Sequence, residues 1–208
     1  MKHNILEIIK KIIHELAERP VIFNLLRRIL EFNYRGEKRV IRDEITVYDR
    51  VLDLGCGTGE LCKEFISKKY VGIDLNDLYI RYAKEKYPDY IFETMDATQL
   101  QFSDNSFDTI LISGVLHHCN NEVAMSILKE VHRVLTPNGK VIIWEDALTC
   151  SKMNIVGRVI QKLDEGEHIL DKDGYLNLFH LYFKITKSYN MVSGFCDYHV
   201  FILESKSN

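Results

Sequence analysis

The sequence predicts an α/β fold in which helices flank a doubly wound, mostly parallel sheet. Its 208 residues, 46% of them hydrophobic and 27% charged, suit a single soluble domain with a full core. Residues 51–54 form a mainly apolar run that predicts a buried strand, and the glycine-rich run 55–59 predicts a tight turn after it. A second apolar run at 71–73 ends in Asp74. Short apolar strands separated by crossover connections are typical of a parallel sheet.

The glycine-rich run is the first candidate ligand site. Glycine allows a positive φ and lets a ligand lie directly against the main chain, because no Cβ stands in the way. We expect a helix to continue from Thr58 to Ile66, with its free N–H groups facing the same space. The three glycines alternate in the loop: Gly55, Gly57 and Gly59.

The spacing of these glycines argues against the common phosphate sites. A dinucleotide-binding loop has the pattern G-x-G-x-x-G and a P-loop has G-x-x-x-x-G-K-[ST], and neither occurs in this loop. Asp53 stands at the end of the strand, where its carboxylate would repel a pyrophosphate and attract a cationic ligand. The loop therefore predicts a site for a nucleoside that carries a positive charge, and it disfavours a nicotinamide-dependent oxidoreductase.

Four segments in this order resemble the signatures of the class I S-adenosylmethionine (SAM)-dependent methyltransferases, over roughly residues 48–145. The acid that ends the second segment, Asp74, would accept hydrogen bonds from the ribose hydroxyls; the alternative is an N-cap of the next helix. In the family, the acid at the position of Asp96 faces the adenine amino group, and here the alternative is an ordinary turn. The four segments are 53–59, 71–74, 92–111 and 131–143.

The resemblance implies a Rossmann-like methyltransferase fold with seven strands, in which the last strand runs antiparallel and inserts into the sheet. It implies SAM as the cofactor and S-adenosyl-L-homocysteine as the product. Similar methyltransferases often hold the SAM carboxylate with a Tyr or Arg before the domain, and an arginine fork suits a carboxylate. Arg35 is the candidate, with a solvated charge cluster as the alternative. The expected cofactor-binding residues are Asp53, Gly55, Cys56, Gly57, Gly59, Asp74, Leu75, Asp96, Ala97, Ser113 and Arg35.

The implied chemistry is direct displacement at the sulfonium methyl group, with a neutral thioether as the leaving group. Alignment of nucleophile, methyl and sulfur then supplies most of the catalysis, and a carbon or oxygen nucleophile also needs a base. His117 and His118 follow the fourth expected strand and are the candidate bases. The L-H-H run recurs in the family across unrelated substrates, so a structural role is the alternative. Weaker candidates for contacting the acceptor are Glu145, Asp146 and His168.

Residues 1–45 predict a helical cap that precedes the methyltransferase domain at 46–208. Apolar residues recur at helical spacing in two stretches, and Pro20 begins the second. Arg27 and Arg28 are expected on the polar face of the second helix. Packing of both helices over the cofactor end of the sheet is the favoured interpretation, and attachment to a membrane surface is the alternative.

The chain after the fifth strand carries weaker signals. We expect a helix at 153–163 and a polar loop at 168–173. The runs 183–186 and 198–203 predict the last pair of strands, and 190–197 fits the turn between them.

Composition narrows the function further. A formal charge of −3 gives no general attraction to nucleic acid. Five cysteines, an odd number without C-x-x-C spacing, argue against a metal site and favour a reduced, cytoplasmic compartment. We therefore expect a metal-independent methyltransferase that acts on a small-molecule, sugar or lipid-linked acceptor. The alternatives are a non-catalytic SAM-binding regulatory subunit and a methyltransferase that acts on a peptide or protein.

Overall fold

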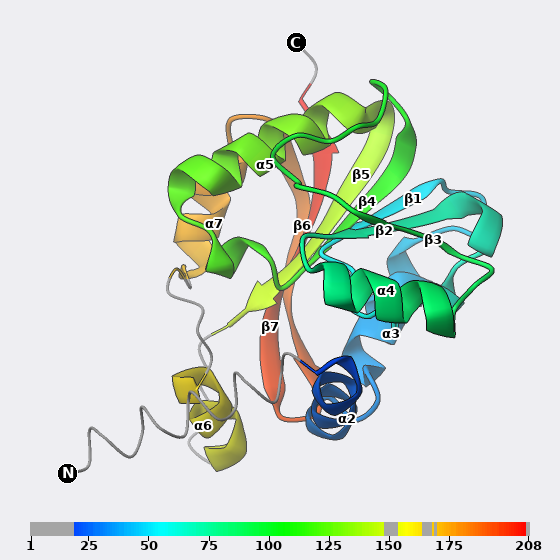
Figure 1. Ribbon diagram of the computed structural model, residues 1–208. Coiled ribbons are helices and arrows are strands. Elements are labelled where there is room, and N and C mark those ends of the chain that lie inside the picture. The colour runs from blue at the N-terminus through cyan, green and yellow to red at the C-terminus, as the bar shows by residue number, and fades with distance from the viewer. Residues whose placement is uncertain (1–18, 148–153, 164–167, 169, 207–208) are drawn as a thin grey trace.

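The computed structural model describes residues 19–147, 154–163, 168 and 170–206. Its centre is a seven-stranded sheet with helices on both faces (Figure 1). The strands are β1 (Val51–Leu54), β2 (Tyr70–Asp74), β3 (Ile91–Thr94), β4 (Phe107–Ser113), β5 (Leu135–Asp146), β6 (Phe183–Ser193) and β7 (Cys196–Ser205). The helices are α2 (Pro20–Leu30), α3 (Arg35–Glu44), α4 (Asp77–Lys86), α5 (Asn121–Val134), α6 (Ile155–Leu163) and α7 (Lys172–Phe179).

The strand order is β3-β2-β1-β4-β5-β7-β6. Each pair from β3 to β5 is parallel, and β7 runs antiparallel between β5 and β6. The α/β fold with an inserted antiparallel last strand is therefore confirmed. No described helix is long and apolar enough to cross a membrane.

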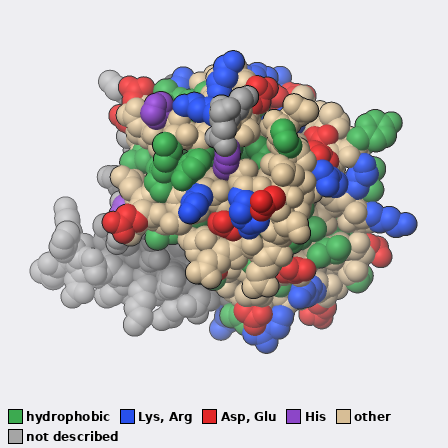
Figure 2. Space-filling view, turned by 90° about the horizontal axis from the view of Figure 1, so that it is seen from above, with side chains coloured by type: hydrophobic (Ala, Val, Ile, Leu, Met, Phe, Trp, Pro, Cys, Tyr) green, Lys and Arg blue, Asp and Glu red, His purple; other side chains and the backbone are tan. Residues whose placement is uncertain are grey.

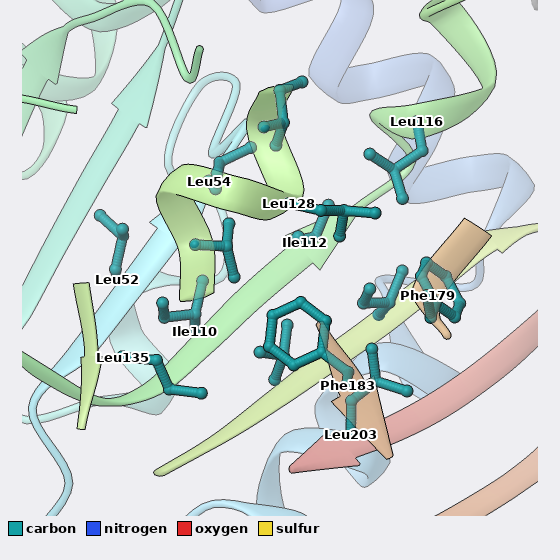
Figure 3. Packing of buried hydrophobic residues seen from close by; sticks show 14 of the residues in the cluster. Leu52, Leu54, Ile110, Ile112, Leu116, Leu128, Leu135, Phe179, Phe183 and Leu203 are labelled. Carbon is teal, nitrogen blue, oxygen red and sulfur yellow. The ribbon is translucent and has the colours of Figure 1, made fainter. Parts of the chain in front are cut away.

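The core consists of two layers because successive strand residues point to opposite faces of the sheet. On one face, Ile110 and Ile112 of β4 pack beside Leu128 of α5, as Figure 3 shows. On the other face, Leu111 lies in a cluster with Trp144 and with residues of α3. The central strands are apolar on both sides for this reason, which is why they read as continuous apolar runs.

The prediction of a helix from Thr58 to Ile66 is wrong. A single 3₁₀ turn, η1 (Cys62–Glu64), stands in its place, followed by a second, η2 (Ser67–Lys69). The glycine loop takes up the first part of the crossover between β1 and β2, and a positive φ of 74° at Gly59 still bends the chain there. Cys62 is fully buried in a cluster with Tyr70, and Phe65 stacks on the Tyr70 ring, so that side-chain packing holds this segment in its short turns.

The carboxyl-terminal expectations need two corrections. The expected turn at 190–197 is too long, because β6 and β7 continue until only residues 194–195 connect them. Gly194 takes a φ of 60° there, as a tight hairpin turn requires. The polar loop ends earlier than expected, since α7 begins at Lys172 with Asp171 as its N-cap, the side chain accepting from Gly174 N at 2.8 Å. The expected helix at 153–163 is present as α6, which begins at Ile155; Asn154 precedes the helix, and residue 153 lies outside the described part.

The cap also differs from expectation. The first predicted helix lies in residues 1–18, outside the described residues, and α3 was not predicted as a helix. The second predicted helix is α2, but the opposite face is directed to the protein. Its polar residues Asn24 and Arg27 face the rest of the molecule, and its apolar stripe faces outward. The boundary at residue 45 stays a prediction, and α3 packs on β6 across it.

A buried polar cluster attaches α2 to the tip of the β6–β7 hairpin. Glu31, next after α2, accepts from Arg27 at 2.7 Å and from the Tyr198 hydroxyl at 3.0 Å. The Ser193 hydroxyl donates to the main-chain oxygen of Glu31 at 3.1 Å and lies against the carboxyl group of Glu37. Burial raises the pKa of Glu37 to about 8, with a further contribution from the charge of Glu31. The cluster therefore holds two buried acids, one of which keeps its proton at neutral pH.

Stability is expected to fall between pH 5 and pH 8 because of Glu37. Its folded-state pKa lies above that of the unfolded chain, so its contribution is complete below about pH 4.5 and is lost as pH rises through about 8. Across this range the wild type should lose on the order of 2 kcal/mol more unfolding free energy than Glu37→Gln. Urea denaturation at several pH values measures the difference. Asp53, whose pKa burial raises to about 7, should leave a residual slope in both proteins. Parallel curves would assign the pH dependence to other groups.

Candidate cofactor site

The glycine loop is a packed turn with one open side. Its three glycines have φ angles of 77°, 53° and 74° in chain order. A Cβ on Gly55 would lie 2.3 Å from the Val115 side chain, and one on Gly59 would lie 2.7 Å from Phe92. On Gly57 the nearest atom is Phe23 Cε1 at 4.0 Å. The main chain at Gly57 therefore faces the space under α2, where a flat ligand can lie against it.

Asp74 stands at the end of β2 and holds the loop. Its Oδ2 accepts from Gly57 N at 2.8 Å, and its Oδ1 accepts from Asn76 N at 2.8 Å. The N-cap of α4 is Asn76, whose side chain accepts from Leu78 N and Tyr79 N. Asp74 is thus not the cap of that helix. Its carboxylate lies beside the open side of the loop, and burial raises its pKa.

Asp53 lies beneath the loop. It is 2% exposed, and its carboxylate accepts from the Tyr70 hydroxyl at 2.7 Å. Burial raises its pKa to about 7, with a smaller contribution from the charge of Asp74. Cys56 likewise turns its sulfur toward β2, since a Cβ on Gly72 would meet it at 2.9 Å. Asp53 and Cys56 can therefore support the loop, and only the main chain of Cys56 is available to a ligand.

The other expected cofactor residues lie at the carboxyl ends of β2, β3 and β4. Leu75 is 74% exposed and directly follows Asp74. Asp96 is exposed, and its Oδ1 accepts from the main-chain and hydroxyl groups of Thr98, both at 2.8 Å. One carboxylate oxygen of Asp96 thus takes part in an ordinary turn, which was the alternative interpretation of this residue. Ala97 and Ser113 are half-buried, and Ser113 pairs with Trp144 of β5.

Helix α2 covers the loop through residues that the sequence did not single out. The Thr58 hydroxyl donates to Asn24, and Asn24 Nδ2 donates to Glu60 at 3.0 Å. Phe23, the neighbour of Gly57, stacks on Tyr79 of α4 with ring centroids 5.1 Å apart. No sequence signal distinguished Asn24, which lies on the side of α2 opposite to its exposed aliphatic residues.

Two arginines lie near this cover, and the structure distinguishes them. Arg35 is exposed at the first turn of α3 and has no ion pair among the described residues. Arg27 points inward, pairs with Glu31 at 2.7 Å and lies over the rings of Phe23 and Tyr34, at 5.7 and 5.5 Å. Arg27 is therefore the cation beside the residue that covers Gly57, and the expectation that it faces solvent is wrong.

The ends of β4 and β5 bring His117 and Glu145 together. His117 is buried, and its Nδ1 lies 2.6 Å from Glu145 Oε2. Glu145 is fully buried and also accepts from three consecutive main-chain N–H groups, at 2.9–3.3 Å, from residues 115–117. The carboxylate thus fixes the turn after β4 and orients the imidazole. Nε2 of His117 lies 3.9 Å from Asp146 Oδ2, so that a second carboxylate is close to the other ring nitrogen.

The two remaining histidine candidates lie next to this pair. His118 is exposed, and its ring centroid lies 4.0 Å from that of His117. The main-chain N–H of His168 donates to the carbonyl oxygen of His117 at 3.1 Å. Among the described residues, no group of three His, Cys, Asp or Glu side chains could hold a metal ion.

The family comparison agrees with this geometry. Residues 51–139, which include the loop, Asp74 and the turn with His117, match the family model described as "Methyltransferase domain". Over these residues the chain is therefore similar to methyltransferase domains. Two relatives extend the comparison beyond it, and a solved structure covers the full length.

The chain is 41% identical over 107 residues to a ubiquinone/menaquinone biosynthesis C-methyltransferase of Bdellovibrio bacteriovorus, covering 47% of this chain and 44% of that protein. It is 32% identical over 110 residues to the human eEF1A lysine and N-terminal methyltransferase, covering 50% of this chain and 16% of that protein. The chain spans about half the length, or less, of the curated relatives that it matches.

The fold of the chain resembles that of a 1,6-didemethyltoxoflavin-N1-methyltransferase from Burkholderia thailandensis. The two share a TM-score of 0.68 and 15% identity, over 100% of this chain and 91% of the other. That crystal structure contains 1,6-didemethyltoxoflavin and S-adenosylhomocysteine. At this identity the likeness establishes the fold alone.

Proposed function

We propose that the protein is a SAM-dependent methyltransferase that acts on a small-molecule acceptor by direct displacement. The observation that carries this proposal is the placement of two groups at one edge of the sheet. The open loop at Gly57 with Asp74 ends β1 and β2, and the His117–Glu145 pair ends β4 and β5. In open α/β sheets, ligands bind outside the carboxyl ends of the strands.

The residues present fit an adenosyl cofactor. The side of Gly57 without a Cβ leaves room for a close approach to the main chain, and Asp74 presents carboxylate oxygens beside it to ribose hydroxyls. The exposed side chain of Leu75 offers an apolar surface to a base. Arg27 is a nearby guanidinium for a carboxylate, in addition to the earlier candidate Arg35. A bound SAM supplies a methyl group on a sulfonium and leaves as a neutral thioether.

His117 is suited to take a proton from the acceptor. A carboxylate only accepts hydrogen bonds, so Glu145 fixes the proton on Nδ1 and leaves Nε2 as the basic nitrogen. A proton gained at Nε2 makes an imidazolium with Glu145 on one side and Asp146 on the other. Both carboxylates favour that cation. The arrangement suits an acceptor whose carbon or oxygen nucleophile must lose a proton.

The relatives support the acceptor class in part. One is a C-methyltransferase by name and another is a lysine and N-terminal methyltransferase. A carbon acid is the acceptor that most needs a base such as His117. We therefore place small molecules with an acidic C–H or O–H group first in an acceptor screen, with lysine peptides as the comparison.

Calorimetric titration tests the cofactor assignment. We expect binding of SAM and S-adenosylhomocysteine and no binding of NAD, because the loop lacks the dinucleotide spacing. Binding of NAD alone would replace the proposal with an oxidoreductase. Absence of all three would leave the site without its proposed ligand and contradict the proposal.

Asp74→Ala is expected to weaken SAM binding by about 1–3 kcal/mol, since it removes the acceptor for the ribose hydroxyls. The same titration measures the change. Asp77→Ala is the matched control, because Asp77 is a neighbouring, exposed carboxylate that pairs with Arg81. Thermal unfolding of both variants without cofactor reports any loosening of the loop. Equal SAM affinity in Asp74→Ala and the wild type would remove the ribose assignment.

A further inference from the structure

Helix α2 has its apolar side on the outside of the molecule. The inward side carries Asn24 and Arg27 beside the ring of Phe23, and Asn24 is the buried residue of this helix. Four aliphatic side chains on the other side are 40–63% exposed. These are Val21, Leu25, Leu26 and Ile29. A row of exposed aliphatic residues on one helix face is more than the scattered apolar residues normal for a surface, and it marks an interaction site.

Within residues 19–42, the exposed charged side chains are all basic. Within residues 19–42 the two carboxylates, Glu31 and Glu37, are buried, so neither offsets the basic side chains outside. Three exposed arginines near α2 have no ion pair among the described residues. They are Arg19, Arg28 and Arg35. The face therefore combines aliphatic side chains with unpaired guanidinium groups.

The apolar surface continues onto the carboxyl-terminal part of the chain. Phe32 is 55% exposed and meets Phe195 of the hairpin turn edge to face, with centroids 5.2 Å apart. The carbonyl oxygen of Phe195 accepts from Asn154 Nδ2 at 2.8 Å, just before α6. The first turns of α6 expose Ile155 and Val159. Both helices lie near this end of the β6–β7 hairpin in Figure 1, whereas the face in Figure 2 carries interspersed acidic and basic side chains.

We propose that this surface, the α2 face, docks on an anionic phospholipid bilayer. The aliphatic side chains enter the boundary between headgroups and acyl chains, and the arginines lie at the lipid phosphates. Amphipathic helices bind membranes in this way, by apolar burial plus attraction to anionic lipid. The basic rim disfavours a second copy of the chain as the occupant, since a two-fold contact would place the same arginines opposite each other.

Docking would place the bilayer directly outside the cover of the cofactor loop. The inward side of α2 contacts Thr58 and Glu60, so one helix has the loop on one side and lipid on the other. The distance between the two surfaces is then the thickness of a single helix, about 10 Å. Vesicle binding itself requires neither cofactor nor acceptor and can be tested separately from methyl transfer.

Co-sedimentation of the full chain with vesicles tests the proposal. Phosphatidylcholine vesicles with phosphatidylglycerol should bind the protein at least about tenfold more strongly than phosphatidylcholine alone, and added salt should weaken that binding. Leu25→Glu combined with Ile29→Glu should lower the partition coefficient about tenfold or more. Leu181→Glu is the matched control, since Leu181 is equally exposed and lies outside the α2 face. Thermal unfolding verifies that each variant is folded.

Three results would overturn the proposal. The first is no binding to the anionic vesicles. The second is equal loss of binding in the double variant and in Leu181→Glu. The third is a dimer, detected by light scattering, that the double variant separates while vesicles bind neither protein, because the α2 face would then be an interface between two copies.

Discussion

Replacing His117 with alanine is expected to lower kcat by about 10²–10⁴-fold while leaving the affinity for SAM within a factor of about two. The reason is that, in the proposed reaction, Nε2 of His117 takes the proton of the acceptor while Glu145 orients the ring through Nδ1. Glu145→Gln should give a smaller decrease in kcat, since the amide leaves the ring in place but no longer stabilises the imidazolium. Steady-state kinetics with the acceptor found in the screen measure both variants.

His118→Ala is the matched control for this prediction, because His118 is the adjacent imidazole and is exposed. A structural role for the L-H-H run would give a different result. His117→Ala would then lower the thermal midpoint and leave kcat per folded molecule unchanged. If His118 is the base instead, His118→Ala and not His117→Ala will lower kcat, and that result would contradict the assignment of His117.

Gly194→Ala is expected to lower the free energy of unfolding by about 2–4 kcal/mol. Gly194 has a φ of 60°, which alanine adopts at a cost, and its Cβ would lie 2.1 Å from the main-chain oxygen of Leu30. That oxygen already accepts from Phe195 N at 2.8 Å, so it cannot move without breaking the contact between α2 and the hairpin. Urea denaturation at one pH measures the loss.

Gly57→Ala is the control that separates the cost of a positive φ from the cost of steric overlap by the added Cβ. It also has a positive φ, of 53°, but its Cβ would find no atom closer than 4.0 Å. Only the cost of the left-handed conformation, about 1 kcal/mol, is expected there. Equal losses in the two variants would show that the hairpin and the end of α2 separate easily, contrary to the close contact that the structure shows.

The fold was predictable where the signal is local. Strands β1, β2 and β4 are mainly apolar and contribute side chains to clusters on both faces of the sheet, so their runs stand out in the sequence. The helix after the glycine loop was predicted wrongly because the conformation of this segment depends on the packing of Cys62 and Phe65 against Tyr70 of β2, which a local pattern does not reveal. Helix periodicity located α2 but not its orientation. That orientation depends on Thr58 and Glu60, which lie more than 30 residues away along the chain.

In the candidate site, too, local motifs were predictable and contacts between distant residues were not. Gly57 and Asp74 belong to motifs that a reader of the sequence can recognise, and the hydrogen bond between them connects two neighbouring strands. Asp53 could not be placed from sequence, because its direction depends on the hydroxyl of Tyr70. The partnership of His117 with Glu145 joins residues 28 positions apart, and only the adjacency of β4 and β5 reveals it.

The buried cluster behind α2 can form only late in synthesis, because the chain is made from its amino end. Glu31 and Glu37 contact Ser193 and Tyr198 across 156–167 positions of sequence, so these contacts wait for nearly the whole chain. Domains form from the amino end during synthesis, and contacts at long separation form late. On the ribosome, the strands that carry the glycine loop emerge well before the hairpin that holds its cover. A nascent chain therefore contains α2 and the glycine loop before it contains the hairpin that holds α2 in place.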